Sequence, residues 1–220
     1  ELRSRGFGTV LKEGFWALLS PVIILGGIYG GICSPTEAAT ISIFYSLIIS
    51  VFVYRTIKIR DLPKILLEGV HSYAPILIIL SAAVAFARVI TLMNVASIVS
   101  EVVLSAISSK VVILLLINVL LLFVGMIMDT GPAILVFTPV LLPVVKALGV
   151  DPIHFGIIMC VNLAIGFVTP PMGANLFVAS NLSKVSVIDI AKKAVPFILA
   201  FLVALLMITF IPEISLFLVK

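Results

Sequence analysis

Residues 111–145 read VVILLLINVLLLFVGMIMDTGPAILVFTPVLLPVV. Asp129 is the only charged residue among these 35. As one helix the stretch would be roughly 50 Å long, whereas the hydrocarbon core of a bilayer is about 30 Å thick. The chain must therefore bend, and DTGP (129–132) at its centre has the composition of a turn. We expect a helical hairpin with arms at 111–128 and 131–146.

The length of the two arms does not determine how deeply the hairpin tip lies in the bilayer. Each arm is short for a complete crossing, so the tip could stop inside the bilayer as a re-entrant hairpin, or the arms could be two crossings. Asp129 has two corresponding interpretations. Inside the bilayer an ionisable side chain is a functional hypothesis, whereas between two crossings it belongs to an ordinary solvated loop.

A second interruption follows in an uncharged run. Residues 152–183 contain no Asp, Glu, Lys or Arg, and TPPMGAN (169–175) interrupts them. Two adjacent prolines remove two backbone donors and free carbonyls of the preceding turn. Irregular backbone at membrane depth persists only where it is buried in protein or lines a wet cavity. A hairpin tip followed by an unwound helix is the pattern expected of a transporter binding site.

The composition is that of an all-α polytopic membrane protein. The chain is 62% hydrophobic and 11% charged, which excludes a soluble globular domain. Continuous apolar runs exclude a porin-like barrel, which has weak alternating segments. The net charge of +4 reflects basic loops of a membrane protein, so we expect no nucleic acid partner.

Four further apolar segments flank the hairpin and the interruption. They lie at 15–32, 38–54, 72–87 and 194–212, with a basic loop at 55–71 and a loop carrying Lys184, Lys192 and Lys193. If the hairpin returns to its own side, ten Lys and Arg residues lie on one side of the membrane, including Arg3 and Arg5. Three lie on the other: Lys110, Lys146 and Lys220. This asymmetry favours the ten-residue side as cytoplasmic.

Two local patterns have structural explanations. Ser34-Pro35-Thr36-Glu37 matches a capping box at a helix start, which favours a structural role for Glu37 over ion binding. Asn118, Asn162 and Asn175 are typical interhelical hydrogen-bond partners in membranes.

Arg88 has two interpretations: it snorkels or pairs structurally, or it attracts an anionic substrate.

The chemistry indicated is ion binding and not catalysis. No motif for hydrolysis and no glycine-rich phosphate loop occurs, so we expect no enzyme, no cofactor and an energy source such as an ion gradient. Backbone carbonyls, the hydroxyls of Thr130 and Thr169 and the carboxylate of Asp129 are suitable ligands for a dehydrated alkali cation. Helix amino ends near Pro132 and Gly173 would attract an anion.

Four segments together resemble one known family. GGIYGGICSPTEAA (26–39), GMIMDTGPAILVFTPVLLPV (125–144), GVDPIHFGI (149–157) and IGFVTPPMGANLF (165–177) are similar, in order and spacing, to the carboxy-terminal half of the large membrane subunit of tripartite ATP-independent periplasmic (TRAP) transporters. That resemblance implies the second of two inverted repeats in an elevator fold. The chain would comprise scaffold helices (1–110), a re-entrant hairpin (111–147), a broken helix (148–184) and a final helix (185–220).

The resemblance also implies a set of site residues. One sodium ion would be held by Gly125, Met128, Asp129, Thr130 and Gly131 of the tip and by Gly166, Thr169, Pro170 and Met172 of the break. The substrate cavity would contain Pro171, Gly173, Asn175 and, as a candidate, Arg88.

The implied function is half of a sodium-coupled symporter for a small organic anion in the bacterial inner membrane. Its implied partners are a small membrane subunit, a periplasmic substrate-binding protein, the amino-terminal half of the large subunit and the lipid bilayer. Two alternatives remain at this point: a structural or assembly fragment without transport activity, and the permease of an ATP-driven importer.

Overall fold

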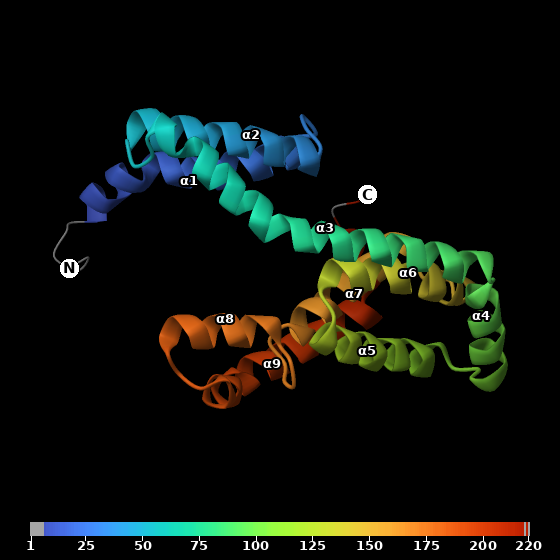
Figure 1. Cartoon of the computed structure of the whole chain (residues 1–220). Coiled ribbons are helices and arrows are strands. Elements are labelled where there is room, and N and C mark those ends of the chain that lie inside the picture. Colours follow the sequence, from blue (N-terminus) through green and yellow to red (C-terminus); the bar gives the residue numbers. More distant parts are fainter. Residues whose placement is uncertain (1–6, 218, 220) are drawn as a thin grey trace. The chain divides into compact units, whose positions relative to one another are not determined.

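The computed structural model describes residues 7–217 and 219, and within them the regular structure is helical throughout (Figure 1). The described residues do not include three of the basic residues counted for the charge asymmetry: Arg3, Arg5 and Lys220. Five of the described helical segments are long and apolar enough to cross a membrane: 35–53, 59–92, 110–127, 130–147 and 187–210. The all-α prediction is confirmed. The chain divides into two compact units, at Ala74 and Pro75 inside α3 (Leu62–Leu92).

The first unit is built on two packed helices, α1 (Phe7–Tyr29) and α2 (Pro35–Ile48). The phenol of Tyr45 donates to the carbonyl of Trp16 at 2.7 Å and ties the two together. A π-helical turn, Ile49–Val53, extends α2.

The predicted capping box at the start of α2 is confirmed. The backbone N–H of Ser34 donates to Glu37 Oε2 at 2.8 Å, and the N–H of Glu37 donates to Ser34 Oγ at 3.4 Å. These reciprocal bonds satisfy two donors that a helix start leaves free, which accounts for Glu37 without an ion.

The predicted bounds of both basic loops are wrong. A 3₁₀ turn (Ile59–Asp61) leads directly into α3, so most of 55–71 is helical. Lys192 and Lys193 lie in α9 (Val187–Phe210), which begins where the Ser186 hydroxyl accepts from the N–H of Asp189. Lys, Leu and Glu are good helix formers, and long basic side chains reach water from a helix end, so charge alone does not mark a loop.

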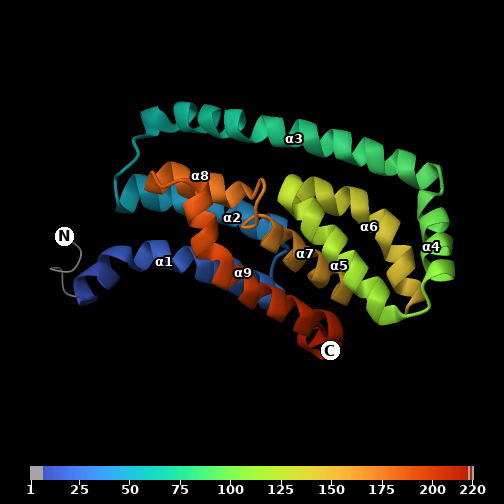
Figure 2. The same cartoon turned by 90° about the horizontal axis from the view of Figure 1, so that it is seen from below.

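The second unit contains the predicted hairpin. Its arms are α5 (Lys110–Ile127) and α6 (Thr130–Ala147), and α7 (Pro152–Gly166) packs against both arms. Figure 2 shows α4 (Val95–Ala106) alongside α6. After the interruption come α8 (Ala174–Ser183), α9 and the short α10 (Pro212–Leu216), and α9 packs against both α7 and α8.

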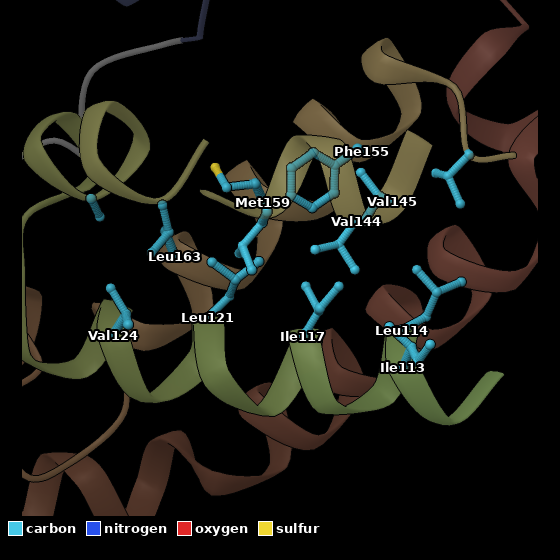
Figure 3. Close-up of a cluster of buried hydrophobic side chains, with 13 residues drawn as sticks. Ile113, Leu114, Ile117, Leu121, Val124, Val144, Val145, Phe155, Met159 and Leu163 are labelled. Carbon is cyan, nitrogen blue, oxygen red and sulfur yellow. The ribbon is translucent and has the colours of Figure 1, made fainter. Parts of the chain in front are cut away.

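The core of this unit lies between the hairpin arms and α7. Figure 3 shows its apolar side chains converging from the three helices. The arms contribute Ile113, Leu114, Ile117, Leu121, Val124, Val144 and Val145, and α7 contributes Phe155, Met159 and Leu163. Because lipid tails are as apolar as these side chains, close packing stabilises the contact more than apolarity does.

Helices α5 and α7 touch backbone to backbone at their carboxyl ends. A Cβ added at Gly166 would lie 2.6 Å from the Cα of Gly125, and one added at Gly125 would lie 2.9 Å from the Cα of Leu163. Small residues are what permit such an approach between membrane helices. Glycine at both positions therefore sets how near the hairpin tip can come to the end of α7.

We expect Gly166→Ala to destabilise the protein because its methyl group would meet the backbone of Gly125. Overpacking of this kind costs about 1–3 kcal/mol. Gly156→Ala is the matched control, since Gly156 is on the same helix and a Cβ there meets nothing within 4 Å. Thermal unfolding of the purified variants should show a lower Tm for the first only. Equal melting temperatures would contradict the backbone contact.

Truncation of Leu121 should be costly, because this side chain is 0% exposed in the core. Leu→Ala at such sites lowers the free energy of unfolding by about 2–5 kcal/mol. Leu116→Ala on the same helix, at a position 51% exposed, should cost much less. Chemical unfolding in detergent compares the two, and similar losses would contradict the assignment of the core face of α5.

Candidate functional site

The hairpin tip is a turn of two residues. Met128 ends α5 in an extended conformation, and Asp129 caps α6, with its carboxylate accepting from the N–H of Thr130 at 2.7 Å. Pro132 lies in the first turn of α6, in agreement with the predicted arm 131–146. A proline is tolerated there because the first N–H groups of a helix have no intrahelical partner.

The interruption spans residues 167–173, between α7 and α8. It begins earlier than TPPMGAN predicts, because the N–H groups of Val168 and Thr169 bond to the carbonyls of Ile165 and Gly166 and close α7. The N–H of Asn175 then donates to the carbonyl of Phe167 at 3.1 Å and bridges the loop. Pro170 and Pro171 have no N–H, so this loop has two fewer backbone donors than carbonyls.

Gly173 shapes the loop just before α8. Its φ is +36°, and a Cβ there would lie 3.0 Å from the carbonyl oxygen of Thr169. Only glycine combines this left-handed conformation with so close an approach. The Pro170–Pro171 bond of the same loop is cis. The Thr169 hydroxyl donates to the carbonyl of Ile165 at 2.7 Å, and its oxygen retains lone pairs for a further contact.

A cavity of about 510 Å³ lies between tip and interruption. It brings together five predicted site residues: Gly125, Met128, Asp129, Met172 and Asn175. Asp129 and Asn175 are both exposed, and α8 begins at this cavity with Ala174, which also lines it. The amino end of a helix and a carboxylate thus border one space, so it offers a partner to a cation and to an anion.

The remaining predicted site residues lie outside the lining of this cavity. Gly166 contacts Gly125, which does line the cavity. Six further residues of the tip and the interruption are not part of the lining: Thr130, Gly131, Thr169, Pro170, Pro171 and Gly173. Arg88 is exposed on α3 and is not part of the lining. A Cβ at Gly131 would lie 3.2 Å from Leu80 Cδ2, so the tip contacts α3 two helical turns before Arg88.

Five lining residues were missed by the sequence analysis: Met126, Ile127, Phe167, Ala174 and Phe177. All are direct neighbours of predicted positions or one helical turn away from them. Their apolar side chains resemble ordinary membrane-helix residues, so the sequence carries no signal that separates them from lipid-facing positions.

The oxygen donors at tip and interruption suit a small monovalent cation. Carbonyls, hydroxyls and one carboxylate are hard ligands with little net charge. Among residues 7–217 and 219, no group of three or more His, Cys, Asp or Glu side chains lies close enough to share a metal ion.

Comparison with known proteins identifies the family of this chain. Residues 2–214 match the family described as tripartite ATP-independent periplasmic transporter, DctM component. The isethionate TRAP transporter permease protein DctMQ of Oleidesulfovibrio alaskensis is 44% identical over 99% of this chain and 35% of its own length. The C4-dicarboxylate TRAP transporter large permease protein DctM of Rhodobacter capsulatus is 38% identical, over 94% of this chain and 47% of its own length.

A third relative is named for a different substrate. The sialic acid TRAP transporter large permease protein SiaM of Vibrio cholerae is 35% identical over 94% of this chain and 49% of its own length. The chain thus spans half or less of the length of these relatives, in agreement with the expected match to one half of a large permease subunit. By the extent of the family match and the order of its motifs, the chain belongs to the DctM component family of TRAP transporters.

Proposed function

We propose that this chain forms one half of the large membrane subunit of a sodium-coupled symporter that imports a small organic anion. The observation that supports the proposal most is the cavity at which Asp129, the tip of the hairpin and the amino end of α8 meet. Sodium binds between tip and interruption, and the anion binds beside it at the helix end. The named substrates of the relatives are themselves organic acids.

Sodium prepares the substrate site in this proposal. Its ligands are the tip residues Gly125, Met128, Asp129, Thr130 and Gly131 and the residues Gly166, Thr169, Pro170 and Met172 of α7 and the interruption. A cation shared by two segments holds them together, and a closed tip presents Pro171, Gly173 and Asn175 to the anion. Arg88 attracts the anion from outside the cavity, by its charge.

The hairpin is re-entrant in this proposal, and the transport motion is of the elevator type. Hairpin, interruption and substrate move together against scaffold helices in the bacterial inner membrane. The partners are the amino-terminal half of the large subunit, a small membrane subunit and a periplasmic substrate-binding protein. The energy for transport comes from the sodium gradient.

An imposed sodium gradient should be sufficient to drive uptake in proteoliposomes that contain the assembled transporter and its binding protein. A potassium gradient of equal size should drive none. Radiolabelled dicarboxylate, sialic acid and isethionate are the first substrates to compare. Uptake that requires ATP would identify an ATP-driven permease instead, and binding-protein-dependent uptake indifferent to sodium would contradict the coupling.

Asp129→Asn should raise the sodium concentration for half-maximal uptake, by about tenfold if the lost charge is worth about 1.4 kcal/mol. Asparagine still caps a helix, so the variant removes the charge and keeps the start of α6. Asp151→Asn is the matched control, because Asp151 is likewise the cap of a helix: its carboxylate accepts from the N–H groups of Ile153 and His154 at the start of α7. Sodium titration of uptake should separate the two, and an unchanged value for Asp129→Asn would contradict a sodium role for this carboxylate.

A further inference from the structure

Two buried asparagine side chains, Asn118 on α5 and Asn162 on α7, link these helices by a hydrogen bond. Asn118 is 3% exposed and Asn162 is 0% exposed. The Nδ2 group of Asn162 donates to Asn118 Oδ1 at 2.8 Å and to the carbonyl of Ile158 at 2.9 Å. The two residues were predicted to be interhelical hydrogen-bond partners, and the structure pairs them with each other.

The pair continues into the last helices. Asn118 Nδ2 donates to Thr209 Oγ1 of α9 at 3.0 Å. The carbonyl of Thr209 lies 3.3 Å from His154 Nε2, which must be the donor because a carbonyl only accepts. His154 Nδ1 in turn lies 3.0 Å from Ser215 Oγ of α10. This buried polar network, Asn118, Asn162, Thr209, His154 and Ser215, connects four helices across an otherwise apolar core.

The amide pair leaves one buried polar atom without a hydrogen bond. Asn162 Oδ1 is buried without a hydrogen-bond partner among the described residues. Turning the amide over would place that oxygen against Asn118 Oδ1 and the Ile158 carbonyl, so the orientation is fixed. An unsatisfied buried acceptor is destabilising, and well-packed apolar side chains often replace buried polar groups without loss. A role in specificity accounts for the pair better than a role in stability does.

The position of the pair relates it to the tip. Asn118 precedes Gly125 by seven residues on α5, which is about two turns, and Asn162 precedes Gly166 by four residues on α7, which is about one turn. All four residues are buried in the same α5–α7 interface. A shift of one helix along the other would move Gly125 away from Gly166 and break the amide bond at the same time.

We propose that the Asn118–Asn162 bond fixes the register of α5 against α7 and thereby positions the hairpin tip opposite the interruption for sodium binding. Apolar side chains alone allow neighbouring registers, because sliding exchanges one apolar contact for another and lipid is equally apolar. A single buried amide pair specifies register in coiled coils at a cost in stability, by the same physical principle. The two asparagines are positioning residues, and their effect on sodium rests on the proposed function.

The test is the double variant Asn118→Leu/Asn162→Leu, which removes both amides and leaves no buried polar atom of the pair unsatisfied. Thr209→Val is the matched control, since it removes one bond of the same network and leaves the Asn118–Asn162 bond in place. Spin labels on Cys160 and on a cysteine replacing exposed Val119 report the distance between α7 and α5, in a background with Cys33→Ala. Uptake in proteoliposomes reports sodium dependence.

We expect a broadened or shifted distance distribution in the double variant only. Half-maximal uptake should then need about threefold more sodium at an unchanged maximal rate, equivalent to the roughly 0.6 kcal/mol of an average interhelical hydrogen bond in a membrane. A wild-type distance distribution would overturn the proposal, as would an unchanged sodium requirement despite altered distances. Asn162→Ala replaces the double variant if the latter does not fold.

The same data separate this proposal from the proposed function. Wild-type uptake without sodium dependence would contradict sodium coupling, whereas the distance distributions would still decide whether the amide pair sets the register.

Discussion

The approach of α5 to α7 at Gly125 and Gly166 is the constraint on which the rest of the site depends. With a Cβ on either residue, the helices could not meet at this distance. Because they do meet, a two-residue turn at one helix end and a seven-residue loop at the other border one cavity. The apolar core formed by α5, α6 and α7 stabilises this contact.

Irregular backbone in a membrane protein must have a reason to persist, since each unsatisfied carbonyl in hydrocarbon costs several kcal/mol. Here Pro170 and Pro171 leave the loop with two fewer backbone donors than carbonyls, and the loop lies beside a cavity. In the proposed function, a cation takes such oxygens as ligands, and this contact offsets the cost of leaving them without backbone donors. The chain belongs to a family of transporter components.

Much of this architecture follows from the sequence, because length and turn chemistry are local. The 35-residue run with one carboxylate predicts the hairpin, and Pro170-Pro171 predicts the interruption. The end of α7 at Gly166 is harder to predict, since it depends on hydrogen bonds of Val168 and Thr169 that no composition rule specifies. Which asparagines pair, and which apolar side chains line the cavity, depends on contacts between distant segments. The full set of site residues came from the family resemblance and not from residue chemistry.

Direct sodium binding tests the central claim, that tip and interruption together hold one cation. The measurement is equilibrium binding of radioactive sodium to the purified, assembled transporter, wild type against Thr169→Val and Thr169→Ser. Valine should weaken sodium binding, because it removes the hydroxyl oxygen, whereas serine should retain it. Equal sodium affinity in all three proteins would contradict the placement of the cation between Asp129 and Thr169.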